Sequence, residues 1–213
     1  MEINRTLRIG YWLSLLGGFL GLVYFGLVIA SLGSGTLLPT GLIATLLHVG
    51  ILLTVPAIVL LWAIIHHVTP AEKQAFSLGS LVFIAIFATL TSINRYNGLT
   101  VVPQATAMGI SEGLDWFQPY GWPSIMFAME ALAWGGYFGL ACLCLAPAFG
   151  EKGIEKAIFW TLIACGGLSL FAVLSQVLNI APLIAPAILA WGPGLILLTV
   201  LWARWFKGQE NRL

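Results

Sequence analysis

The residue with the clearest potential for chemistry is Glu130, because its carboxyl group interrupts a long apolar stretch over residues 122–148. A charge within the hydrocarbon of a bilayer costs about 2.5–3.5 kcal/mol on insertion scales, so an ionisable residue there indicates a functional role by default. A protonated Glu130 could donate a proton as a general acid, whereas pairing with Arg95 or His48 would favour the carboxylate. The structural alternative is that Glu130 only hydrogen-bonds a neighbouring helix and holds the bundle together.

Other residues are expected to share a site with Glu130. Six are predicted to bind a ligand there: His48, Asn94, Arg95, Met126, Trp134 and Gln176. Met126 and Trp134 lie four residues before and after Glu130, a spacing that places all three on one helix face. His48 and Glu130 each lie about 10–12 Å from the same side of the bilayer at about 1.5 Å of rise per residue. For His48 alone, a structural role is the alternative.

Several classes of site are not indicated. The sequence has no GxxxxGK[ST] phosphate loop and no basic stripe of the kind that binds nucleic acid. No metal site is expected, because His66 and His67 fall on the opposite side of the bilayer from His48. The three cysteines lie in apolar surroundings without a CxxC spacing and are interpreted as packing residues. No cofactor is identified.

Composition predicts the elements that must position these residues. The chain has 213 residues, of which 60% are hydrophobic and 8% charged, whereas soluble domains are about 25% charged. A membrane-spanning helix needs about 20 mostly apolar residues. Six segments qualify: residues 9–32, 41–65, 75–94, 122–148, 156–178 and 183–206. We therefore predict an all-α polytopic membrane protein in which residues 1–213 form a single six-helix transmembrane bundle.

The distribution of basic residues predicts the orientation. Of the 9 Lys and Arg residues, all except Arg95 fall at the two termini or in the second and fourth loops. The positive-inside rule then places the N-terminus and the C-terminus in the cytoplasm. The strongly polar residues within the spans gather on the opposite half, which predicts a hydrated pocket in the outer leaflet with Glu130 near its floor.

The segment 95–121 is expected to be an extracytoplasmic loop, because Pro103 and a polar, glycine-containing stretch follow the third span. Within it, residues 111–117 are predicted to form a short amphipathic helix capped by Ser111. Such a long connection acts either as a lid or as an inert surface helix.

Small residues and prolines predict how the helices pack. Gly17 and Gly21, like Gly135 and Gly139, have the spacing that lets membrane helices approach closely, and we expect them to pack within the bundle. Kinks are expected at Pro56, at Pro186 and at the Gly192-Pro193-Gly194 run.

Three segments together resemble a widespread family of small uncharacterised bacterial membrane proteins: Leu99-Thr100-Val101-Val102-Pro103, Gln118-Pro119-Tyr120-Gly121 and Phe127-Ala128-Met129-Glu130-Ala131-Leu132-Ala133-Trp134. The resemblance extends from the third helix to about Pro147. It implies a six-helix protein of the bacterial cytoplasmic (inner) membrane, with Glu130 in the family pattern. Ala133-Trp134 stands where that pattern has Gly-Tyr, and the resemblance implies no activity.

These features favour a protein that binds or transports a small hydrophobic or amphiphilic molecule of the lipid, isoprenoid or quinone class, in contact with membrane lipids. One alternative is a membrane-embedded enzyme that uses Glu130 as a general acid on an isoprenoid, as a cyclase would. The other is an accessory subunit with a membrane protein partner.

Overall fold

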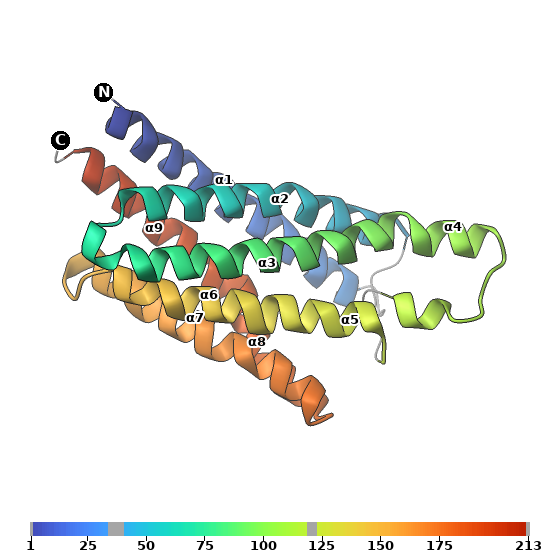
Figure 1. Cartoon of the computed structure of the whole chain (residues 1–213). Coiled ribbons are helices and arrows are strands. Elements are labelled where there is room, and N and C mark those ends of the chain that lie inside the picture. Colours follow the sequence, from blue (N-terminus) through green and yellow to red (C-terminus); the bar gives the residue numbers. More distant parts are fainter. Residues whose placement is uncertain (1, 34–40, 119–122, 212–213) are drawn as a thin grey trace.

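The computed structural model describes residues 2–33, 41–118 and 123–211, and all regular structure within these ranges is helical (Figure 1). Six helical stretches are long and apolar enough to cross a membrane: Ile3–Ala30, Gly41–Val68, Ala71–Ala107, Ile125–Ala148, Gly153–Val177 and Ala181–Glu210. For the described residues, the prediction of an all-α fold with six helices long and apolar enough to cross a membrane is therefore confirmed. The side of the membrane that holds the termini stays a prediction.

Nine α-helices make up these spans: α1 (Glu2–Gly33), α2 (Gly41–Val68), α3 (Gln74–Leu99), α4 (Val101–Ala107), α5 (Ile125–Glu130), α6 (Phe138–Leu145), α7 (Gly153–Val177), α8 (Ala185–Leu189) and α9 (Leu195–Glu210). Within the described ranges, four short 3-10 turns lie at Ala71–Lys73, Leu114–Phe117, Ala146–Ala148 and Ala181–Ile184. The α-helices at either end of the fourth and sixth spans are joined by π-helical segments, at Ala131–Tyr137 and Ala190–Gly194.

Both π-helical segments lie in the interior of a span. Pro193 lies inside the second of them, where its missing N–H and its ring prevent a regular α-helix. Pro186 instead stands in the first turn of α8, a position that tolerates proline. The break expected at Gly192-Pro193-Gly194 is therefore present, whereas Pro186 begins a helix rather than kinking one.

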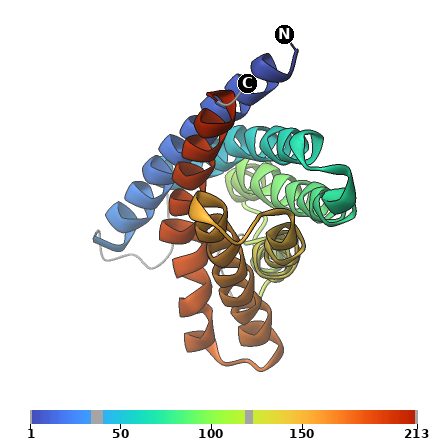
Figure 2. The ribbon, with the colours of Figure 1, turned by 90° about the vertical axis from the view of Figure 1, so that its left-hand side faces the viewer.

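The spans pack in a closed ring in the order α1, α2, α3, α6, α7 and α9, and α9 returns to α1 (Figure 2). The first residues of α1 and the last of α9 lie at one end of the bundle, which we call the termini end, and α4 lies at the other, the α4 end (Figure 1). In the most apolar window of the first span, only 11% of the residues are buried, against 28–61% in the other five. The first helix is thus the wall of the ring least embedded in the protein.

Aromatic side chains fill the middle of the ring. Trp62 of α2 packs edge-on against Trp202 of α9, with ring centroids 4.8 Å apart. Its indole N–H donates to the Ser80 hydroxyl at 2.8 Å, and Ser80 donates to the Ala141 carbonyl oxygen at 2.7 Å. A chain of hydrogen bonds therefore links α2, α3 and α6 inside an apolar core, where an unpaired indole or hydroxyl group would be costly.

The segment expected to be a loop after residue 94 is largely helical. The third helix continues to Leu99, and α4 follows directly up to Ala107. Pro103 is compatible with this because it lies in the first turn of α4, where its missing N–H is not needed. The turn beyond is a 3-10 helix, Leu114–Phe117, that begins after Gly113 in a left-handed conformation (φ 73°) rather than after a Ser111 cap.

Glycines bring α7 against the fourth span, as the spacing of Gly135 and Gly139 predicted. A Cβ atom at Gly135 would lie 3.0 Å from Ala172 Cβ, and one at Gly139 would lie 3.1 Å from the Gly166 carbonyl oxygen. At Gly166 it would lie 2.6 Å from Leu143 Cγ. By contrast, Gly167 has nothing within 4 Å of its Cβ position.

We predict that Gly166→Ala lowers the free energy of unfolding by about 1–3 kcal/mol, because the added methyl group overpacks the α6–α7 contact. Denaturant unfolding in mixed micelles measures the loss. The matched control is Gly167→Ala on the same helix, which should leave stability unchanged or slightly increased. Equal losses in the two variants would contradict this packing.

Candidate ligand-binding site

A buried ion pair joins the third and fourth spans. Arg95 of α3 donates through Nη2 to Glu130 Oε1, and the neighbouring Asn94 donates through Nδ2 to Glu130 Oε2. The Arg95 side chain is 2% exposed and the Glu130 side chain 12%. Two consecutive residues of α3 therefore hold both oxygens of one carboxylate. Three of the predicted site residues come together in this cluster.

Glu130 lies where the backbone of the fourth span changes from α-helix to π-helix. It is the last residue of α5, and the π-helical segment Ala131–Tyr137 follows. The carbonyl oxygen of Trp134 in that segment accepts a hydrogen bond from Trp191 Nε1 at 3.2 Å. The same indole N–H also reaches Ser169 Oγ at 3.1 Å. The irregular segment is thus tied to the sixth and fifth spans, and such π-bulges are frequent at functional sites.

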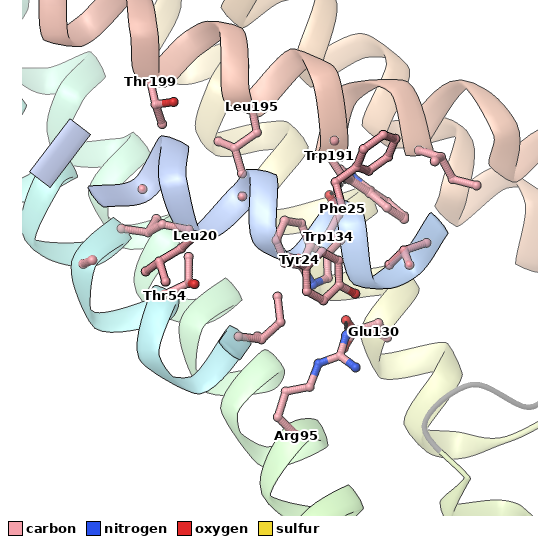
Figure 3. A pocket seen from close by; sticks show the side chains of 18 of the residues that line it. Leu20, Tyr24, Phe25, Thr54, Arg95, Glu130, Trp134, Trp191, Leu195 and Thr199 are labelled. Carbon is pink, nitrogen blue, oxygen red and sulfur yellow. Dashed lines mark hydrogen bonds and ion pairs between the residues drawn. The ribbon is translucent and has the colours of Figure 1, made fainter. Parts of the chain in front are cut away.

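A cavity of about 250 Å³ lies against this ion pair, between the first, second and sixth spans. Arg95 and Glu130 form one end of its lining, and Thr54, Leu20 and Thr199 lie away from them (Figure 3). Most of the lining is aliphatic or aromatic and comes from α1, α2 and the sixth span. One end of the cavity therefore has two opposite charges that neutralise each other, and the rest of its lining is mostly apolar.

The two threonines far from the ion pair do not offer free hydroxyl protons to the cavity. Thr54 Oγ1 donates to the Gly50 carbonyl oxygen at 2.8 Å, and Thr199 Oγ1 donates to the Ile196 carbonyl oxygen at 2.7 Å. Both hydroxyl groups are turned back onto their own helices, as is common for threonine inside apolar helices. Polarity in the cavity is consequently concentrated at the Arg95–Glu130 end.

Tyr24 of α1 is a site residue that the sequence reasoning missed. It lines the cavity with Arg95 and Glu130, lies beside them in Figure 3, and interacts electrostatically with both. A signal was present, because Tyr24 follows Gly17 and Gly21 at the i+7 and i+3 spacing of a single helix face. Those glycines also line the cavity, so this face of α1 combines small residues with one aromatic hydroxyl group.

Trp134 lines the cavity, and its ring packs against two aromatic neighbours. Phe87 packs edge-on against it with centroids 4.7 Å apart, and Trp191 lies 6.0 Å away. Phe127 also lines the cavity. The face of the fourth span that meets the cavity is therefore Phe127, Glu130 and Trp134, at i, i+3 and i+7.

The structure does not bring Met126, His48 and Gln176 into the lining. Met126 is buried, but the face that meets the cavity is centred one residue further along the helix. His48 packs on the backbone of α3, where a Cβ atom at Gly98 would lie 2.5 Å from its Nε2. Gln176 lies on α7, which packs against α6, α8 and α9, and it donates to Ser175 Oγ at 3.1 Å. His48 is nevertheless close enough to Arg95 to interact with it electrostatically, so it lies near the ion pair but outside the cavity lining.

Both oxygens of the Glu130 carboxyl group accept hydrogen bonds, one of them from the Arg95 guanidinium group, and charge-assisted bonds of this kind are strong. Among the described residues, no group of three or more His, Cys, Asp or Glu side chains is arranged to hold a metal ion.

We predict that Arg95→Met or Glu130→Met alone lowers the free energy of unfolding by about 3–5 kcal/mol, because each leaves one buried charge without its partner. The double variant should recover most of this loss, since it removes both charges together. A double-mutant cycle by denaturant unfolding in mixed micelles measures the coupling. Additive losses in the double variant would contradict a coupled ion pair.

Comparison of the chain with protein-family models, curated proteins and solved structures finds no match. The site is therefore interpreted from its own geometry, and the resemblance to a bacterial membrane family stays an expectation from the sequence.

Proposed function

We propose that this protein binds a small amphiphilic molecule in the cavity beside the Arg95–Glu130 pair, with the polar head at the ion pair and the apolar part toward Thr54 and Thr199. The observation that carries the proposal is the one-sided polarity of the cavity. Its charged groups lie at one end, and the threonine hydroxyl groups at the other end donate to their own helices. Pockets that are mostly apolar with a few convergent polar groups are typical of small-molecule sites.

The volume supports a ligand of modest size. The cavity measures about 250 Å³, which exceeds the roughly 150 Å³ of an apolar cavity that binds benzene. It falls just below the roughly 300–1,000 Å³ of pockets for drug-sized ligands. We infer a ligand whose apolar part inside the cavity is a chain of about ten carbon atoms or the first part of a longer isoprenoid.

Electrostatics favour a neutral head group. Arg95 and Glu130 already neutralise each other, so a charged ligand would bring an uncompensated charge into a low-dielectric site. A hydroxyl or carbonyl head can hydrogen-bond to the pair without that cost. Isoprenoid alcohols and quinones have such heads, whereas fatty acids and lipid phosphates do not.

The position of the cavity supports exchange of the ligand with the bilayer. Residues of α1 form one wall, and α1 is the least buried of the spans. The ion pair lies in the part of α3 that leads toward the α4 end. If the termini are cytoplasmic, as the basic residues predict, the polar end of the cavity belongs to the outer leaflet.

A series of ligands with one chain and three heads tests the proposal: 1-decanol, decanoate and decylammonium, measured by native mass spectrometry of the purified protein. We expect decanol to bind at least tenfold more tightly than either ion, because the site is electrically neutral. Glu130→Gln should shift the preference to decanoate by about tenfold, since Arg95 then lacks its counter-ion. Arg95→Gln should shift it to decylammonium.

A substitution that fills the cavity tests whether the ligand binds there. Ala57 lines the cavity, and Ala57→Phe should abolish binding without changing any charge. The matched substitution Leu60→Phe lies on the exposed face of the same helix and should leave binding intact. Equal binding of the three heads to every variant, or full binding to Ala57→Phe, would refute the proposed site.

A further inference from the structure

A second cavity, of about 290 Å³, lies at the termini end of the bundle, the end that faces the viewer in Figure 2. It lies between two helix connections, with Thr69, Pro70 and Lys73 on one side and Ala148 and Phe149 on the other. It shares no lining residue with the cavity at Arg95 and Glu130. Because connections between spans lie at the membrane boundary, this cavity is at the level of lipid head groups.

Two opposite charges line this second cavity without pairing. Lys73 Nζ donates to the Ala148 carbonyl oxygen at 3.3 Å. Glu155 accepts from the Gly150 backbone N–H at 2.9 Å and from Trp205 Nε1 at 3.1 Å. The ion pairs within 4.0 Å in the described part of the chain do not include one between Lys73 and Glu155. Each charge is held by neutral groups and keeps further hydrogen-bonding capacity.

The carboxylate of Glu155 is held in place before any ligand binds. Trp205 is buried and packs edge-on against Phe149, with centroids 5.4 Å apart. A Cβ atom at position 150 would lie 2.5 Å from Glu155 Oε2, so a larger residue there would displace the carboxylate from this position. This second cavity therefore has a fixed anion, a separate cation and an apolar part that includes Ile3, Leu7 and Val68.

We infer that this cavity binds the phosphoethanolamine head group of a membrane phospholipid, with the phosphate at Lys73 and the primary ammonium at Glu155. Separated charges of opposite sign match a head group that carries both, and they leave no net charge on binding. A primary ammonium can donate hydrogen bonds to the free lone pairs of Glu155, which a quaternary choline cannot do. Ile3, Leu7 and Val68 offer apolar surface to the start of the acyl chains. This inference does not depend on the ligand of the first cavity.

Native mass spectrometry of the purified protein with dioleoyl phosphatidylethanolamine, phosphatidylcholine and phosphatidylglycerol tests the inference. We expect the ethanolamine lipid to bind at least tenfold more tightly than the other two. Glu155→Gln and Lys73→Gln should each remove this preference. Glu151→Gln and Lys152→Gln make the same charge changes at exposed positions of the neighbouring connection and should keep it.

Two further measurements keep the outcome decisive if a charge variant does not fold. Ile3→Trp changes a partly exposed lining residue, leaves both charges in place and should also remove the preference. Soluble O-phosphoethanolamine should compete only weakly, because it lacks the acyl chains. Three results would overturn the inference. The first is equal binding of the three lipids to the native protein, and the second is a preference that survives Glu155→Gln, Lys73→Gln and Ile3→Trp. The third is competition by the soluble head group at the affinity of the lipid.

Discussion

The interaction on which this structure depends is the buried ion pair between Arg95 and Glu130. Neither charge would be stable alone in an apolar bundle, because an unpaired ion within a membrane is strongly disfavoured. The pair therefore requires α3 and the fourth span to stay in contact, and the Asn94 amide occupies the second carboxylate oxygen. Because Arg95 and Glu130 neutralise each other, they add no net charge to the cavity beside them. A cavity lined by a closed ion pair selects for ligands that carry no net charge.

The closed ring of spans explains why a cavity is present beside that pair. Small residues and hydrogen bonds bring the third, fourth and fifth spans together, and Gly139 and Gly166 lie where the fourth and fifth spans are in contact. The first helix is the least buried span, and its face toward the cavity includes the small residues Gly17 and Gly21 as well as Tyr24. Tight packing on one side of the ring and a small-residue face on the other leave the space between them. Within the π-helical segment after Glu130, the Trp134 carbonyl oxygen accepts a hydrogen bond from Trp191, which joins two residues of the cavity lining.

Hydropathy predicted the six spans because the cost of polar groups in hydrocarbon acts on each segment separately. The same cost singled out Glu130, and the end of the third span supplied Asn94 and Arg95. Depth along each helix did not reveal which helices are neighbours, so neither His48 nor Gln176 lines the cavity, although His48 interacts electrostatically with Arg95. Neighbour relations arise from packing around the ring, which no single segment encodes. Tyr24 was missed for the same reason, since its role appears only when α1 closes the ring.

The most direct test of the central claim is the position of a bound ligand with a heavy atom at its tail. Anomalous diffraction from crystals with 10-bromodecan-1-ol would locate the bromine within the bundle. We expect the bromine near Thr54 and Thr199, with the hydroxyl group at the Arg95–Glu130 pair. Bromine beside the ion pair, or only on the outer surface of the helices, would contradict a cavity oriented by that pair.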